Sequence, residues 1–317
     1  MSKRNSLLEL WRFVFCMAVL LIHVSNSYNQ ATGGSSDFFH AGYLGVEFFF
    51  IVAGYFIGSY YTKKQAGKPI AERLRSIVSY AWSRFVRLYP LYILALCLML
   101  LVRTVFVGKS FGYIITTVKN CLAEFFLLQW TPLGNEVLVS ACWFVPAVFF
   151  GGLLFVALLA LTGKFTGYVI APIASFFIYR YYFNLIGKID VIPAHHGILR
   201  GIAGIGLGLF IYFIVELLCK LITKYNITRI YSFIAGSISS ILFLGIFIYT
   251  NYGRRSRWDF LIIALYGIGV LLLMSSQIKV PKKAETLFTF LGKHTYAIYV
   301  LQMPIIEALV HMIKAAI

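Results

Sequence analysis

Long apolar segments recur along the chain, separated by short polar ones. Nine of them are close to the length of about 20 residues that an α-helix needs to cross the hydrocarbon core of a bilayer. They lie at approximately residues 8–26, 43–61, 86–107, 141–161, 165–183, 198–218, 231–250, 259–276 and 294–312. The pattern therefore predicts an all-α fold, a polytopic transmembrane helical bundle.

A tenth apolar segment, at residues 111–130, is interrupted by Lys119 and Glu124. It could cross the membrane, lie along its surface or re-enter it, and if it crosses, the orientation of every later span inverts. We therefore expect nine to ten spans. The chain shows no internal repeat, low-complexity tract or long linker, so residues 1–317 are expected to form a single membrane-embedded domain.

The amino-acid composition excludes a soluble protein. Hydrophobic residues make up 60% of the chain and charged residues only 12%, against about 25% charged residues in soluble domains. The net charge of +17 falls mostly in short segments between apolar runs, which is the positive-inside pattern of a protein in a lipid bilayer and not a nucleic-acid surface. The loop 27–42 contains no lysine or arginine, so we expect the N-terminus inside the cell and this loop outside. The five cysteines form no CxxC pair, so neither a disulfide framework nor a metal site is expected.

The first apolar segment carries two ionisable residues, Arg12 near its start and His23 near its end. They are eleven residues apart, which on an α-helix is three turns plus about 20°, so both side chains project from one face. Along the helix axis they are separated by roughly 16 Å, about half the thickness of the hydrocarbon core. Ionisable groups inside a span usually face a protein interior or a wet cavity, so we expect a functional pair. The alternative is that both side chains snorkel to the headgroups.

Three more charged residues are candidates for a site. Arg84 and Arg87 are three residues apart near the start of the third span, so on a helix they form a two-pronged cationic grip suited to phosphate. An anchor to anionic lipids is the alternative. Glu47 lies near the outer start of the second span, where a carboxylate needs a partner unless it sits at headgroup level. His23 is the expected partner, and Glu47 would then fix the tautomer of its imidazole.

Two further features are interpreted as structural. Glycines at 201, 204, 206 and 208 lie inside an apolar span without a preceding strand, which favours close packing of helices over a nucleotide-binding loop. Glu9 lies one turn before Arg12, and we expect these two side chains to form an ion pair.

These motifs together make the chain resemble the acyltransferase-3 family of bacterial membrane proteins, which O-acylate surface carbohydrates. The residues that match the family's four motifs are, in chain order, Arg12 and His23; Gly45, Val46, Glu47, Phe49, Phe50 and Gly54; Arg84, Arg87 and Pro90; and Leu291, Gly292, Thr295, Tyr296 and Tyr299. Ala53 stands where the family usually has serine, and Gln302 where it usually has histidine. His23 is therefore the motif histidine that remains for proton transfer.

The resemblance implies an integral membrane O-acyltransferase, most simply an O-acetyltransferase, in the bacterial plasma membrane. Its acyl donor would be acetyl-CoA or another acyl-CoA bound from the cytoplasm. Its acceptor would be a hydroxyl of a cell-surface polysaccharide, an oligosaccharide or a lipid-linked carbohydrate, and no metal would take part.

In this hypothesis Arg84 and Arg87 hold the polar head of the acyl-CoA, and its arm enters the bundle alongside Arg12. His23, oriented by Glu47, acts as general base or as a transient acyl acceptor. The scheme requires Arg12 and His23 to share one water-accessible passage. The main alternative is a transporter or flippase for an anionic or lipid-linked molecule, which would use the same charges as a substrate path.

Overall fold

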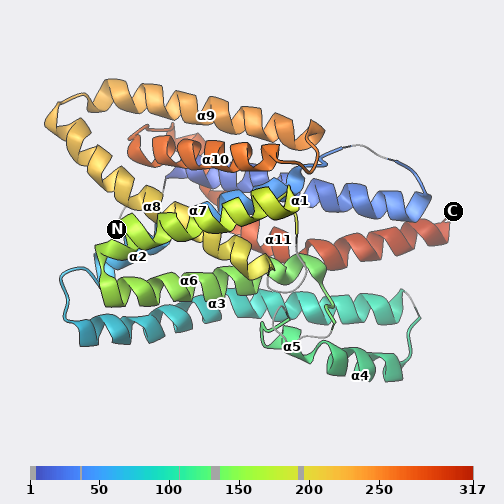
Figure 1. Ribbon diagram of the computed structural model, residues 1–317. Coiled ribbons are helices and arrows are strands. Elements are labelled where there is room, and N and C mark those ends of the chain that lie inside the picture. The colour runs from blue at the N-terminus through green and yellow to red at the C-terminus, as the bar shows by residue number, and fades with distance from the viewer. Residues whose placement is uncertain (1–4, 36–37, 107, 130–135, 192–195, 317) are drawn as a thin grey trace.

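The computed structural model describes residues 5–35, 38–106, 108–129, 136–191 and 196–316, and these residues form helices and loops without a strand (Figure 1). Nine helical segments in this part of the chain are long and apolar enough to cross a membrane. They contain, in order, α1 (Ser6–Thr32), α2 (Gly45–Lys64), α3 (Ile70–Val105), α6 (Phe144–Thr162), α7 (Ala171–Tyr181), α8 (His196–Lys224), α9 (Thr228–Tyr252), α10 (Trp258–Ser275) and α11 (Lys282–Ala316). The predicted polytopic helical bundle is confirmed.

Short helical turns extend several of these spans. A 3-10 turn, η1 (Gly42–Leu44), precedes α2, and a second, η2 (Ser140–Trp143), precedes α6. Two π-helical turns, η3 (Thr166–Ile170) and η4 (Tyr182–Ile186), flank α7. Because they bring α7 to membrane-spanning length, the span predicted at 165–183 is present, although its central α-helix has only 11 residues.

The segment predicted as a doubtful tenth span does not cross the bundle in the part that the structure describes. It forms α4 (Phe111–Asn120) and α5 (Leu122–Phe125), of 10 and 4 residues. At 1.5 Å per residue even α4 is only about 15 Å long, half the thickness of the hydrocarbon core. In Figure 1 both short helices lie beside the end of α3.

Glu124 explains why this apolar segment carries a carboxylate. Its side chain is buried and accepts hydrogen bonds from the backbone N–H groups of Leu138 and Val139. The Tyr92 hydroxyl in α3 donates to the Glu124 carbonyl oxygen at 2.6 Å. Burial raises the pKa of Glu124 to about 7, although the two N–H donors act to lower it. Glu124 therefore holds α5 against α3 and against the residues that precede η2.

α2 is the most enclosed span, and it packs along most of its length against α8. The two backbones approach closely at a pair of glycines. A Cβ atom at Gly54 would lie 1.9 Å from the carbonyl oxygen of Ile205, and one at Gly208 would lie 1.8 Å from that of Ile51. The interpretation of the α8 glycines as packing residues is therefore confirmed, and this contact fixes α2 in the centre of the bundle.

We predict that Gly208→Ala destabilises the protein, because the new methyl group has to displace backbone and not a flexible side chain. We expect the free energy of unfolding to fall by at least about 1–3 kcal/mol, which is the usual cost of overpacking. The matched control is Gly245→Ala in α9, where an added Cβ has open space within 4 Å. Thermal unfolding of both variants in detergent measures the difference, and equal melting temperatures would contradict the packing.

Candidate active site

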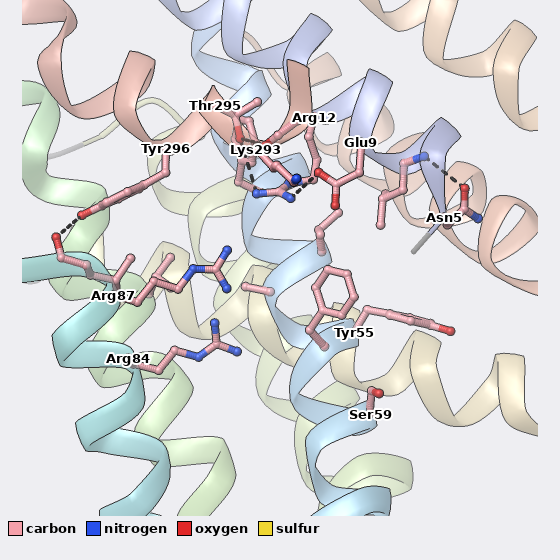
Figure 2. Close-up of a pocket in the computed structure, with 18 of the residues that line it drawn as sticks. Asn5, Glu9, Arg12, Tyr55, Ser59, Arg84, Arg87, Lys293, Thr295 and Tyr296 are labelled. Carbon is pink, nitrogen blue, oxygen red and sulfur yellow. Dashed lines mark hydrogen bonds and ion pairs between the residues drawn. The ribbon is translucent and has the colours of Figure 1, made fainter. Parts of the chain in front are cut away.

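A cavity of about 600 Å³ lies among α1, α2, α3, α6 and α11 (Figure 2). Part of its lining lies at the end of the bundle where α1 and α11 begin and α2 ends. We call this the basic end, because the lysines at 63, 64, 282 and 283 lie there. The other end is called the opposite end.

The part of the cavity toward the basic end is strongly cationic. Five basic side chains line it, against one carboxylate, that of Glu9. The basic residues are Arg12, Lys63, Arg84, Arg87 and Lys293. In Figure 2 the two arginines of α3 extend toward the cavity from one side, with Arg12 and Lys293 across from them. Such a concentration of positive charge favours an anionic ligand.

Arg12 is held in the cavity by α1 and α11 together. Its guanidinium Nη1 lies 2.8 Å from Glu9 Oε2, which confirms the predicted ion pair, and its Nη2 donates to the Thr295 hydroxyl at 3.4 Å. Glu9 in turn packs on Gly292, where a Cβ atom would lie 2.1 Å from Oε2. The small residue at 292 therefore lets α11 approach close enough to position Arg12.

Arg84 and Arg87 share one face of α3, as their spacing predicts. The helix that carries them starts at Ile70 and not near residue 86, so both arginines lie well inside a continuous helix. The guanidinium of Arg84 lies over the ring of Tyr80, 5.1 Å from its centroid, a cation–π contact. Both side chains line the cavity together with Arg12, so three of the predicted site residues meet in one place.

The cavity becomes apolar with depth. On α2 its lining runs from Lys63 to Phe49, which are fourteen residues apart and therefore separated by about 21 Å along the helix. The lining at the deep end is formed by Phe49, Val52, Ala53, Phe144, Val148 and Tyr299. The cavity thus reaches through about two thirds of the thickness of a hydrocarbon core.

Four aromatic rings pack together at this deep end, and three of them, those of Phe49, Phe144 and Tyr299, line the cavity. The Phe144 ring centroid lies 6.1 Å from that of Phe49, 4.9 Å from that of Phe50 and 5.2 Å from that of Tyr299. We call these four residues the aromatic wall. The Tyr299 hydroxyl donates to the Ala141 carbonyl oxygen at 3.0 Å, which ties the wall to η2.

Glu47 lies beyond the wall in a second polar group. Its carboxylate is fully buried and accepts hydrogen bonds from Arg200 Nε at 3.0 Å and from the Tyr179 hydroxyl at 3.1 Å. Arg200 is also fully buried and lies 3.6 Å from Asp190, whose other oxygen pairs with Arg255 at 2.6 Å. We call these five residues the outer polar network, because they lie toward the opposite end.

His23 lies beside this network, and its expected pairing with Glu47 is replaced by a different one. The preceding residue, Ile22, packs against Gly42 at the start of the α2 span, so His23 is level with the opposite end. The carboxylate that interacts electrostatically with His23 is that of Asp190, whereas Glu47 is taken by Arg200 and Tyr179. A buried arginine needs an anionic partner more than a neutral imidazole does, which accounts for the difference.

The aromatic wall separates Arg12 from His23. Arg12 is among the residues that line the cavity and His23 is not. Trp143 packs on Phe50 of the wall, with ring centroids 5.9 Å apart, and the Arg200 guanidinium lies 4.8 Å from the centroid of the Trp143 ring. This cavity therefore includes Arg12 and not His23, and one passage shared by both residues stays a prediction.

Comparison with known families identifies the chain. A family model described as an acyltransferase domain, that of the acyltransferase-3 family, matches residues 5–317. The chain belongs to the acyltransferase-3 family. Comparisons with curated proteins and with solved structures each gave no significant match.

The motif residues of this acyltransferase divide between the two places. Those from the first, third and fourth motifs that line the cavity are Arg12, Arg84, Arg87, Gly292, Thr295, Tyr296 and Tyr299, whereas Glu47 belongs to the outer polar network. Ala53, which replaces the usual serine, lines the cavity and makes it more apolar. Gln302, which replaces the usual histidine, is buried one turn beyond Tyr299.

Sequence reasoning missed Arg200, Asp190 and Tyr179. Arg200 had a usable signal, since it is a lone cation inside the apolar run 198–218 and such a charge needs a partner. Asp190 and Tyr179 gave no comparable signal, because a carboxylate in a short loop and a tyrosine in a span are ordinary. Within the described residues no group of three histidine, cysteine or acidic side chains could hold a metal ion.

We predict that Glu47→Ala lowers the free energy of unfolding by about 3–5 kcal/mol, because it leaves the buried Arg200 charge without its carboxylate. The double variant Glu47→Leu/Arg200→Met is expected to recover most of this loss, since it removes both charges. Thermal unfolding of the purified variants measures both effects.

The control for this pair is Arg103→Met, which breaks the partly exposed ion pair between Arg103 and Glu307 at 3.1 Å. That substitution is expected to lower the free energy of unfolding by about 0–1 kcal/mol. A Glu47→Ala variant as stable as Arg103→Met would show that the outer polar network does not hold the bundle together.

Proposed function

We propose that this acyltransferase moves an acyl group, most simply acetyl, from acyl-CoA in the cytoplasm to a carbohydrate hydroxyl on the other side of the bacterial plasma membrane. The carbohydrate would be a surface polysaccharide, an oligosaccharide or a lipid-linked precursor. The observation that carries the proposal is the cavity, which joins five basic side chains at the basic end to an apolar, aromatic deep end.

This arrangement suits both parts of an acyl-CoA molecule. The phosphates of its head carry several negative charges, and arginine binds phosphate oxygens through its planar fork of donors. The uncharged arm and thioester would lie deeper, among Val52, Val148 and the aromatic wall. The basic end faces the cytoplasm under the positive-inside rule, which is the compartment that supplies acyl-CoA.

In the proposed reaction, His23 takes the proton of the acceptor hydroxyl, and the oxygen attacks the thioester carbonyl carbon. The carbon–sulfur bond then breaks, and the CoA thiolate leaves toward the basic end. General base catalysis of this kind contributes about 10²–10⁴-fold to a rate. Because the wall separates the thioester from His23, its rings have to move aside for the two reactants to meet.

The roles of the other predicted residues follow from their contacts. Arg84 and Arg87 would bind the phosphates, and Arg12, whose guanidinium is held by Glu9 and Thr295, would neutralise further negative charge on the donor. Glu47 acts through Arg200 and not on His23 directly. The carboxylate proposed to orient His23 is therefore Asp190.

We predict that Arg84→Ala and Arg87→Ala each weaken acetyl-CoA binding by about tenfold or more, because a hydrogen bond to a charged group is worth about 1.5–3 kcal/mol. Titration calorimetry on protein in lipid nanodiscs measures the dissociation constants. The control is Arg75→Ala, which removes an exposed arginine of the same helix outside the cavity. Unchanged affinity in both cavity variants would refute the assignment of the donor site.

We predict that His23→Ala abolishes most acetyl transfer, by about 10²-fold or more, without changing acetyl-CoA affinity, because the histidine lies beyond the aromatic wall. Transfer of labelled acetyl groups to the carbohydrate fraction of membranes measures the rate. The control is His294→Ala, which removes an exposed histidine of α11. Full activity of His23→Ala would exclude His23 as the general base.

A further inference from the structure

We infer that the aromatic wall restricts the donor to short acyl chains and that Phe144 is the residue that determines this length. The inference rests on the proposed function, since it assumes that Arg84 and Arg87 hold the phosphates of an acyl-CoA. It adds what the proposed function leaves open, namely which acyl groups the cavity accepts and which side chain excludes the others.

The distance from the arginines to the wall follows from the helix geometry. The Arg84 guanidinium lies 5.1 Å from the Tyr80 ring, and that ring lies 5.0 Å from the ring of Tyr60 on α2. These two contacts link Arg84 to Tyr60, and the inference places the arginine at the level of Tyr60 on α2. Phe49 of the wall is eleven residues further along the same helix, which is roughly 16 Å at 1.5 Å per residue.

The arm of an acyl-CoA nearly fills this distance. About twelve bonds join the pyrophosphate ester oxygen to the thioester sulfur, and an extended chain advances roughly 1.2 Å per bond, as a polypeptide does, which gives about 14 Å. With phosphates on Arg84 and Arg87, the sulfur would arrive about 2 Å short of the wall. The acyl group would therefore lie among the rings of the wall, where acetyl needs the least room and each further methylene would press harder against them.

Phe144 is the central member of the wall. Its ring contacts the other three, whereas no ring contact is recorded between Phe49 and Tyr299 in the described structure. It lines the cavity at the first residue of α6, directly after Trp143, which is held against Arg200. The start of α6 is thereby anchored to the outer polar network, so a longer acyl chain has to displace the Phe144 ring itself and not the helix that carries it.

The test measures binding of CoA, acetyl-CoA, butanoyl-CoA and hexanoyl-CoA to the full-length protein in lipid nanodiscs. The wild-type protein should bind CoA and acetyl-CoA alike and bind the two longer donors about tenfold or more weakly, since one excess methylene in a fitted pocket costs at least this factor. Phe144→Ala should abolish this preference, so that the variant binds butanoyl-CoA and hexanoyl-CoA as tightly as it binds CoA.

Two further variants make the test specific. Phe49→Ala opens the wall from α2 and should give the same shift, even if Phe144→Ala fails to fold. Phe149→Ala removes a phenylalanine from the same helix outside the cavity and should leave the preference unchanged. Equal wild-type binding of all four ligands, or an unaltered preference in both wall variants, would overturn the inference. If none of the four ligands binds, CoA included, the result would instead refute the donor site of the proposed function.

Discussion

A charged side chain inside a bilayer must be paired with another charge or reach water, because the hydrocarbon core offers neither hydrogen bonds nor counterions. The bundle meets this constraint in two ways. Arg200 is fully buried and paired with Glu47 and Asp190, whereas Arg12 keeps part of its guanidinium exposed in the cavity while pairing with Glu9. The first solution anchors helices, and the second leaves positive charge available to a ligand.

The aromatic wall gives these two groups of charges different surroundings. On one side an anionic donor can enter from the basic end, and on the other the outer polar network and His23 lie near the opposite end. In the proposed function, a closed wall would keep water from that side away from the thioester, which would otherwise be lost to hydrolysis. Transfer across the membrane would then require only a few rings to move, with the donor head and the acceptor each remaining in its own compartment.

The sequence was sufficient for the fold and for the basic residues that meet in the cavity. Span length and hydropathy located the nine crossing helices, and spacing alone put Arg84 and Arg87 on one face and paired Glu9 with Arg12. It could not locate partners distant in the chain. Glu47 and Arg200 are 153 residues apart, and which carboxylate reaches which cation depends on how α2 packs on α8. The sequence did not predict the aromatic wall either, because aromatic residues are too common in spans for these four to be singled out.

The proposed function depends on an acyl-CoA that occupies the basic cavity with its thioester at the aromatic wall. A cryo-electron microscopy structure of the protein in nanodiscs with acetyl-CoA would locate the ligand. We expect density for the phosphates beside Arg84 and Arg87 and for the sulfur beside Phe49 and Phe144. Density for the ligand outside this cavity, or with its head at the opposite end beside His23, would rule out this binding site.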